Sequence, residues 1–247
     1  MLGIEIMKDV KVYKDIKQVS QAVCEKILSL SLSCKEEECA HISLSGGTTP
    51  KVIFQMLADN YATKINWSCL HFWWGDERCV DYDSLDSNYG EAKKILFDKV
   101  ELLPPGNIHP VNTALGPEQA CLDYLQVMKK YIKLKNDLPI YDLIIGLGSD
   151  GHTASLFPND ISVDCQKWVA IGTQPETSQS RVSITYKMIN NAKEIIFIVT
   201  GKAKEEVIKN LFTDKHKSQR YPAHYINPTG GSLIWYMDET ASRAVKG

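Results

Sequence analysis

YDLIIGLGSDGHTASLFP, residues 141–158, is the most informative part of this chain, because an apolar strand runs directly into a glycine-rich loop. Residues 143–145 form a continuous apolar run, which is typical of a strand buried on both faces of a sheet. The glycines that follow let the backbone adopt positive φ angles and approach a ligand closely. Asp150 and His152 lie in that loop, and open α/β sheets bind ligands at the carboxyl ends of their strands. The stretch therefore predicts a reaction centre at the end of a buried strand.

Other interpretations of the same loop stay open at this level. GLGSDG fits the G-x-G-x-x-G fingerprint of dinucleotide sites, but Pro158 cuts short the helix that should hold the pyrophosphate. LGSDG differs from the G-x-S-x-G nucleophile elbow, because Leu147 stands in place of the first glycine. A tight turn with a hydrogen-bonded histidine is the third alternative. Residues 153–157 are expected to form one helical turn before Pro158, and the flanking glycines favour a functional role for the loop.

Length and composition fit one globular domain that spans residues 1–247. The chain is 44% hydrophobic and 23% charged, and it contains no long linker, internal repeat or low-complexity segment. A formal net charge of -2 gives no electrostatic argument for nucleic acid or for an anionic membrane surface. No apolar run approaches the ~20 residues that a membrane helix needs. The sequence therefore predicts no nucleic-acid partner and no membrane attachment.

The cysteines and the N-terminal residues bear on the compartment. There are 7 cysteines, an odd number without C-x-x-C pairs, so free thiols in a reducing cytoplasm are expected. Residues 1–15 lack the cationic region and the apolar core of a secretory signal. Cys34, Cys39 and His41 lie close in sequence, but their spacing is not that of a zinc site. We therefore expect a cytoplasmic protein without a metal.

A second glycine-rich stretch follows an earlier strand. Residues 41–44 are expected to form a buried strand that leads into SGGTTP, residues 45–50. The two glycines leave room for a ligand against the main chain, the threonines offer hydroxyls and an N-cap, and Pro50 suits the first helical position. A glycine loop that feeds a helix N-terminus suits phosphate, although the G-K-[ST] ending of a Walker A motif is absent. The alternative is a capped helix start without a ligand.

Charged side chains follow two further apolar strands. LHFWW, residues 70–74, runs into GDER, residues 75–78, and three charges after an apolar strand need partners or a ligand. Arg78 is suited to neutralise an anion. EIIFIVT, residues 194–200, leads into a helix whose first turn holds Lys204. A lysine there opposes the helix dipole unless an anion lies between them, and the alternative is a solvated surface lysine.

The order of the elements predicts an α/β fold. Amphipathic helices are expected at residues 16–30 and 116–135, where apolar side chains recur every three or four residues. Further strands are expected at residues 168–172 and 181–185. We therefore predict an open, mostly parallel Rossmann-like sheet with helices on both faces. In such a sheet the four unusual loops share one edge, and their convergence indicates a single site.

Three motifs of the chain resemble those of the 6-phosphogluconolactonases. SGGTTP, WGDER and GLGSDGHTASLFP match the signatures of that family in order, and the similarity covers nearly the whole chain. The glucosamine-6-phosphate deaminases of the same superfamily share the first loop. They carry a DEY-like stretch in place of residues 76–78, and they continue the G-H motif as I-A-F-N-E-P in place of residues 153–158. Both differences favour the lactonase.

The resemblance implies hydrolysis of 6-phospho-D-glucono-1,5-lactone to 6-phosphogluconate in the oxidative pentose phosphate pathway, without a cofactor. It implies that His152 is the base that activates water, and that the Gly46–Thr48 loop, Arg181 and Lys204 hold the phosphate. A monomer or a homodimer is expected. The expected substrate-binding residues are Ser45, Gly46, Gly47, Thr48, Asp76, Gly148, Arg181 and Lys204.

These residues suit the implied reaction. A lactone is an activated ester, and an imidazole with an unperturbed pKa near ~6.5 is matched to a base that acts at neutral pH. Asp150 is expected to orient His152 or to stabilise its cationic form, and Arg78 to stabilise the oxyanion or bind a hydroxyl or carboxylate. The alternative function is that of a regulator, a catalytically silent protein that senses a sugar phosphate. Such regulators usually add a DNA-binding helical domain, for which the first strand, expected near Val10, leaves no room.

Overall fold

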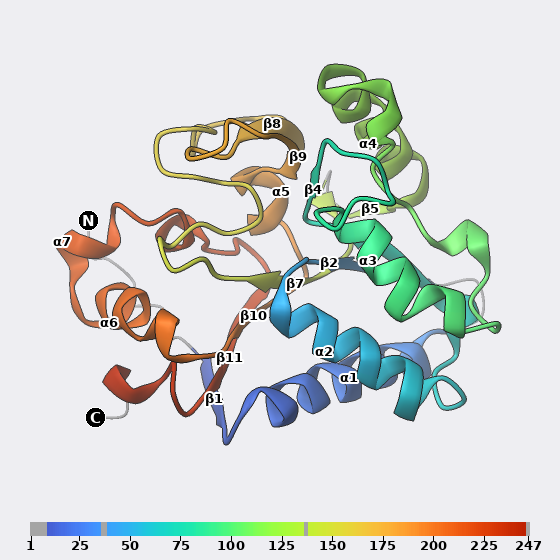
Figure 1. The fold of residues 1–247 in the computed structure, drawn as a ribbon, viewed down its shortest axis with the longest axis horizontal. Coiled ribbons are helices and arrows are strands. Elements are labelled where there is room, and N and C mark those ends of the chain that lie inside the picture. Colours follow the sequence, from blue (N-terminus) through green and yellow to red (C-terminus); the bar gives the residue numbers. More distant parts are fainter. Residues whose placement is uncertain (1–8, 36–38, 136–137, 246–247) are drawn as a thin grey trace.

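Six parallel strands form the central sheet of the protein (Figure 1). The structure is a computed structural model and describes residues 9–35, 39–135 and 138–245. Every neighbouring pair of strands in this sheet runs parallel, so the prediction of an open, mostly parallel α/β sheet is confirmed. In spatial order the strands are β1 (Asp9–Tyr13), β11 (Ser232–Asp238), β10 (Glu194–Val199), β7 (Asp142–Gly146), β2 (Ala40–Leu44) and β3 (Leu70–Trp74).

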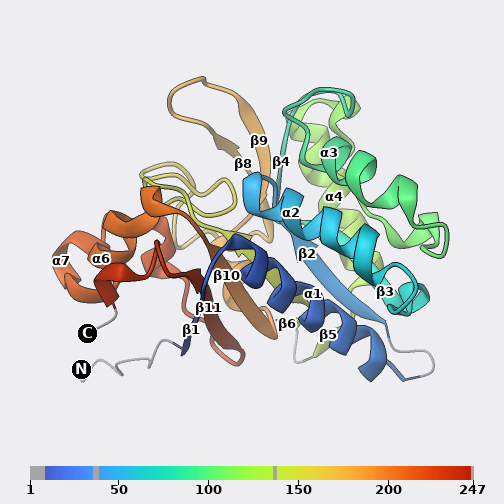
Figure 2. The ribbon, with the colours of Figure 1, turned by 60° about the horizontal axis from the view of Figure 1, so that its bottom comes forward.

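Helices cover both faces of this sheet, as the sequence predicts (Figure 2). One face carries α1 (Ile16–Ser33), α2 (Thr48–Met56) and α3 (Asn88–Ile95). The other face carries α4 (Pro117–Tyr131), α5 (Tyr186–Asn190) and α6 (Glu205–Thr213), and the short α7 (Lys215–Ser218) packs on α6.

The central strands are apolar on both faces because each face has a hydrophobic core of its own. Ile196 and Ile198 of β10 belong to the core under α1, α2 and α3. Phe197, between them in sequence, belongs to the core under α4, α5 and α6. Successive side chains of a strand point to opposite faces, so a strand between two helical layers needs a continuous apolar run.

The strands β2 and β7 are neighbours in space but far apart in the chain. Ile42 and Ser43 of β2 pair with Asp142 and Leu143 of β7. From β2 the chain proceeds to β3 on one side, whereas from β7 it proceeds to β10 on the other side. This reversal makes the carboxyl ends of β2 and β7 a topological switch point, where open α/β sheets bind ligands.

A second sheet, which is antiparallel, continues from the end of β3. The Gly75 N–H donates to the Leu44 carbonyl oxygen, and the Gly75 carbonyl accepts from the Ile184 N–H. The strands expected at residues 168–172 and 181–185 therefore exist but lie outside the central sheet. In spatial order this sheet contains β4 (Asp76–Arg78), β9 (Ser180–Ile184) and β8 (Val169–Thr173). The strands β5 (Leu134–Lys135) and β6 (Leu138–Pro139) form a separate short ladder.

The expected helical turn at residues 153–157 is wrong. Thr153 and Leu156 form an isolated β-bridge, and Ala154 has a φ of 47°. The polar groups of this segment bond to other elements instead, as when the Thr153 hydroxyl donates to the Gly146 carbonyl over 2.9 Å. Tertiary partners therefore replace the local hydrogen bonds that a helical turn would make.

The expected start of α2 is also wrong in detail. The helix begins at Thr48, so Gly47 is the N-cap, Pro50 is the third helical residue, and no side chain caps this end. Gly47 has a φ of 106°, a conformation that glycine tolerates and other residues avoid. The chain can therefore turn into the helix earlier than a threonine cap would allow.

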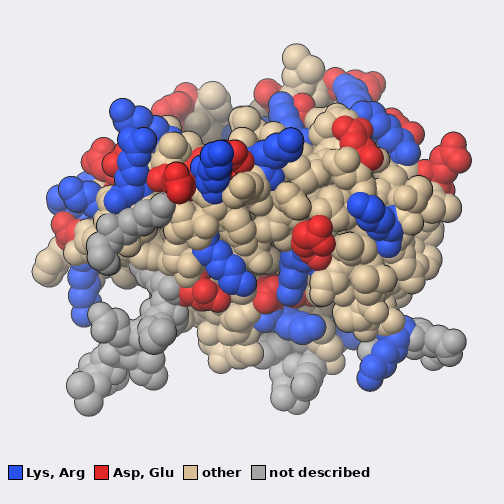
Figure 3. Space-filling view, turned by 90° about the horizontal axis from the view of Figure 1, so that it is seen from below, with Lys and Arg blue, Asp and Glu red and all other residues tan. Residues whose placement is uncertain are grey.

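Charges of both signs are mixed on the face of the molecule that carries α1 (Figure 3), in keeping with the small net charge of the chain. Within the described ranges, no helix combines the length and the apolar character that crossing a bilayer requires.

Candidate active site

A cavity of about 470 Å³ lies at the carboxyl edge of the central sheet, at the switch point between β2 and β7. Residues 46–50 line it after β2, Gly146 and Leu147 line it after β7, and residues 200–204 contribute Thr200, Gly201 and Lys204 after β10. We call it the carboxyl-edge cavity. Its volume is within the range of roughly 300–1,000 Å³ that is typical of small-molecule sites.

The carboxyl-edge cavity is suited to an anion. The N-terminus of α2 opens onto it, with free N–H groups and the positive end of the helix dipole. Lys204 is half-buried in its wall; burial lowers the pKa of Lys204, while the charge of Asp150 acts in the opposite direction. The hydroxyls of Thr49 and Thr200 lie 2.7 Å apart and join the two loops that flank the cavity.

Asp150 and His152 form a hydrogen-bonded pair in the loop after β7. The His152 Nδ1 lies 2.5 Å from the Asp150 Oδ1, and the imidazole side chain is 32% exposed. Burial acts to raise the pKa of Asp150, but hydrogen bonds and charge from His152 outweigh it and lower this pKa below its ordinary value. The ionised carboxylate can only accept, so a neutral His152 carries its proton on Nδ1. The lone pair then lies on Nε2, which has no hydrogen-bond partner among the described residues.

Gly148 packs directly against this pair. A Cβ atom at position 148 would lie 2.2 Å from the His152 Nδ1 and 2.3 Å from the Asp150 Oδ1. The Gly148 N–H also donates to the His152 carbonyl over 2.8 Å, which closes the loop. The imidazole can therefore lie where it does only because residue 148 has no side chain.

Arg181 reaches the same loop from β9. Its guanidinium carbon lies 5.6 Å from the centroid of the Phe157 ring, and that ring lies 4.8 Å from the His152 ring. Phe157 therefore lies between a permanent cation and the imidazole. Burial lowers the pKa of Arg181, although the nearby Asp76 carboxylate acts in the opposite direction.

Asp76 connects the His152 loop to the second sheet through its side chain. Its Oδ2 accepts a hydrogen bond of 2.6 Å from the Ser155 hydroxyl, and the Arg181 Nη1 lies 3.8 Å from the same oxygen. Ser155 is fully buried, so this bond is shielded from water. Asp76 thereby positions the loop and the arginine together.

Arg78 lies beside Arg181, since the two residues are partners in the ladder between β4 and β9. The Arg78 Nη1 donates to the Asp86 carbonyl over 2.7 Å. In both arginines the Nε is buried and lacks a hydrogen-bond partner within the described part of the chain. Two permanent cations with unused donors therefore stand next to each other.

Glu77 has a structural role. It is fully buried, and its carboxylate accepts from the main-chain N–H groups of Arg78, Asn88 and Tyr89 and from the Ser87 hydroxyl. Burial nevertheless raises the pKa of Glu77. This residue holds the start of α3 against β4.

The expected site residues fall into two neighbouring groups and one outlier. Those that line the carboxyl-edge cavity are Gly46, Gly47, Thr48 and Lys204. Those that contact the imidazole, or are linked to it through Ser155, Phe157 and each other, we call the acid–base cluster: Asp76, Arg78, Gly148, Asp150, His152 and Arg181. The two groups are close in space, because the charge of Asp150 acts to raise the pKa of Lys204. Ser45 lies behind them, because it is buried and its hydroxyl donates to the Ile144 carbonyl over 3.2 Å.

Sequence reasoning missed several supporting residues. Asn88 donates to the Asp76 carbonyl over 2.8 Å and lies so close to Gly46 that a Cβ there would overlap its side chain. Asp238 accepts from the Gly201 N–H over 2.9 Å. The position of Asp238 at the end of a parallel strand was a usable signal, whereas nothing near Asn88 in the sequence points to Gly46.

Comparisons with known proteins agree on one family. The sequence model described as Glucosamine-6-phosphate isomerases/6-phosphogluconolactonase matches residues 14–235. The chain is 41% identical over 207 residues to a 6-phosphogluconolactonase from Haemophilus influenzae, which covers 82% of this chain and 86% of the relative. The crystal structure of the devB protein has a TM-score of 0.91 at 37% identity, covering 97% of this chain and 100% of that one. A 6-phosphogluconolactonase from Trypanosoma brucei has a TM-score of 0.83 at 26% identity, covering 96% and 98%.

Proposed function

The chain belongs to the glucosamine-6-phosphate isomerase/6-phosphogluconolactonase family, and we propose that it hydrolyses 6-phospho-D-glucono-1,5-lactone to 6-phosphogluconate. In this proposal His152 is the general base. The relative from Haemophilus influenzae bears the name 6-phosphogluconolactonase. The observation that carries the role of His152 is its 2.5 Å contact with Asp150, which leaves Nε2 at the carboxyl edge of the sheet without a hydrogen bond to any described residue.

Water activation is the first step of the proposed reaction. The Nε2 of His152 takes a proton from a water molecule while the water oxygen attacks the lactone carbonyl carbon. The imidazole becomes a cation, and the ionised Asp150 carboxylate stabilises that cation and keeps the ring in place. General base catalysis of this kind contributes ~10²–10⁴-fold.

The charge that develops on the carbonyl oxygen needs a donor that does not itself titrate. Arg78 and Arg181 are adjacent cations, and the buried Nε of each has no hydrogen-bond partner among the residues that the structure describes. An arginine stays protonated at neutral pH, so it stabilises the oxyanion and then the product carboxylate. Collapse of the tetrahedral intermediate breaks the bond to the ring oxygen, which receives the proton from His152.

The phosphate of the substrate would occupy the carboxyl-edge cavity. The α2 N-terminus offers main-chain N–H groups, and Lys204 offers a half-buried charge from the opposite wall. This placement leaves the lactone ring to extend toward His152. Arg181 lies with the acid–base cluster, so in this proposal it contacts the carbonyl end of the substrate beside Phe157, while Lys204 and the α2 N-terminus bind the phosphate.

The function is tested by offering the purified protein two substrates in the presence of a chelator. We expect acid release from freshly made 6-phosphogluconolactone well above its spontaneous rate, and no ammonia from glucosamine 6-phosphate. Deamination needs several proton transfers on an amino sugar, whereas Arg78 is a permanent cation that repels a substrate ammonium and cannot act as a base. Acid release is followed with a pH indicator, and ammonia with a coupled assay.

Ammonia production without acceleration of lactone hydrolysis would overturn the proposed function. A lactonase activity that disappears with the chelator and returns with a divalent metal would overturn the metal-free mechanism instead.

Replacing Lys204 by alanine should weaken binding of 6-phosphogluconate by at least about tenfold, because a charge-assisted hydrogen bond is worth roughly 1.5–3 kcal/mol. Binding of unphosphorylated gluconate should change little. Calorimetric titration with both ligands measures the two affinities. The exposed Lys202, two residues earlier and outside the cavity wall, supplies the matched control, Lys202→Ala. Equal losses for both ligands would show that Lys204 does not read the phosphate.

A further inference from the structure

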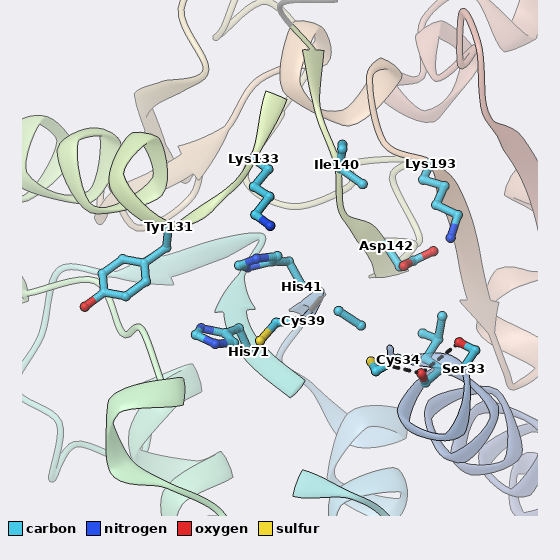
Figure 4. A pocket seen from close by; sticks show the side chains of 12 residues that line it. Ser33, Cys34, Cys39, His41, His71, Tyr131, Lys133, Ile140, Asp142 and Lys193 are labelled. Atoms are coloured by element: carbon cyan, nitrogen blue, oxygen red, sulfur yellow. Dashed lines mark hydrogen bonds between the residues drawn. The ribbon is translucent and has the colours of Figure 1, made fainter. Parts of the chain in front are cut away.

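A second pocket, of about 350 Å³, opens at the opposite edge of the central sheet (Figure 4). The amino-terminal ends of β2, β3 and β7 contribute His41, His71 and Asp142. Lys133, after α4, and Lys193, before β10, add two basic side chains to its lining. We call it the amino-edge pocket. No step of the proposed lactonase reaction uses it.

Asp142 is a buried carboxylate in this pocket without a hydrogen bond at one oxygen. The residue is 7% exposed, and its Oδ1 has no hydrogen-bond partner in the described part of the chain. Burial raises the pKa of Asp142, even though the charges of Lys193 and Lys26 act in the opposite direction. Asp142 also lines the pocket, so a ligand there can donate to its carboxylate, and a buried acceptor gains more from a donor than an exposed one does.

His41 offers a donor from the other face of the sheet. Its Nδ1 accepts a hydrogen bond of 3.1 Å from the indole N–H of Trp73. Burial, together with the nearby His71, His109 and Lys133, lowers the pKa of His41 to about 3, so the ring is neutral at pH 7. A neutral imidazole that accepts at Nδ1 carries its proton on Nε2, so His41 acts as a donor there.

Two lysines add positive charge to the lining of the pocket. Figure 4 shows Lys133 beside His41, and Asp142 with Lys193 on the other side of the pocket. Both ammonium groups are exposed, and no ion pair within 4 Å is formed by either of them among the described residues. Their charges are therefore available to a ligand whose other end enters the pocket.

We propose that the amino-edge pocket is a second ligand site, which binds a small phosphorylated molecule whose other end presents N–H donors, with guanosine 5′-monophosphate as the matching mononucleotide. The lysines hold the phosphate, and the Asp142 carboxylate accepts from the base. Guanine offers N–H donors from its amino group and ring, together with the O6 acceptor that His41 can serve. Adenine and cytosine place an unprotonated ring nitrogen beside their amino group, and a carboxylate repels that lone pair.

Calorimetric titration tests the proposal while the active site is held occupied by saturating 6-phosphogluconate. Guanosine 5′-monophosphate should bind with a Kd below about 1 mM, and more tightly than adenosine 5′-monophosphate, guanosine or ribose 5-phosphate. Asp142→Asn should weaken guanosine 5′-monophosphate about tenfold or more and leave ribose 5-phosphate unchanged. The double variant Lys133→Ala/Lys193→Ala should weaken both phosphates and leave guanosine unchanged.

The exposed Lys209 on α6 supplies the control, Lys209→Ala, which should change none of these affinities. The proposal is overturned if guanosine 5′-monophosphate shows no binding up to about 1 mM, or if 6-phosphogluconate displaces it. It is also overturned if the pocket variants bind as the wild type does. Because Lys133 and Lys193 are exposed, the double variant keeps the test decisive even if Asp142→Asn fails to fold. A negative result leaves the lactonase proposal untouched, since the latter is measured by acid release.

Discussion

The variant His152→Ala is expected to fold normally and to lose ~10²–10⁴-fold in kcat for lactone hydrolysis. The imidazole is 32% exposed, and it contacts the Asp150 carboxylate and the Phe157 ring, so its removal opens no large cavity in either core. What is lost is the Nε2 lone pair that takes the proton from water. The measurement is the initial rate of acid release from fresh lactone, corrected for spontaneous hydrolysis.

A matched control for this variant is His216→Ala. His216 is an exposed imidazole on α7, far in sequence from the acid–base cluster, and its replacement should leave kcat unchanged. A folded His152→Ala protein with near wild-type kcat would rule out the proposed base.

The variant Gly148→Ala is expected to lower kcat by about 10²-fold, the effect that a displacement of roughly 1 Å has on a catalytic group. The new Cβ would lie 2.2 Å from the His152 Nδ1 and 2.3 Å from the Asp150 Oδ1, so the pair must separate or shift together. Binding of 6-phosphogluconate should change much less, because Gly148 is not part of the wall of the carboxyl-edge cavity.

Gly106→Ala is the control for this second variant, since a Cβ at Gly106 meets no atom within 4 Å and the residue lies in a remote turn. Kinetics on both variants separate kcat from KM, and circular dichroism verifies the fold. If Gly148→Ala keeps the wild-type kcat, the close packing of residue 148 against the imidazole does not position the base.

The acid–base pair was predictable because its two members are only two residues apart. Asp150 and His152 lie on one loop, and the glycines around them indicate a backbone with positive φ angles. The glycine-rich start of α2 was predictable for the same reason, although its helix begins at Thr48 and not at Pro50. The error there is small, because helix ends depend on one or two dihedral angles.

The environment of the pair was not predictable, because it depends on residues that are distant in the chain. Ser155 and Asp76 are 79 residues apart, yet their hydrogen bond of 2.6 Å sets the position of the His152 loop. That bond also explains why residues 153–157 leave the helical conformation the local sequence favours. Arg181 reaches the cluster from a strand that no local pattern assigns to a separate sheet.

The parallel α/β sheet and its helical layers follow from the sequence alone, because apolar periodicity and glycine-rich strand ends are local properties of the chain, and the family follows from its three motifs. Which charges meet depends on the tertiary fold. It paired Arg78 with Arg181, gave Glu77 a structural role, and left one oxygen of the Asp142 carboxylate, at the opposite edge of the sheet, without a hydrogen bond from any described residue. The physical reason is that a hydrogen bond or an ion pair depends on the distance between atoms, and strand order sets that distance independently of separation along the chain.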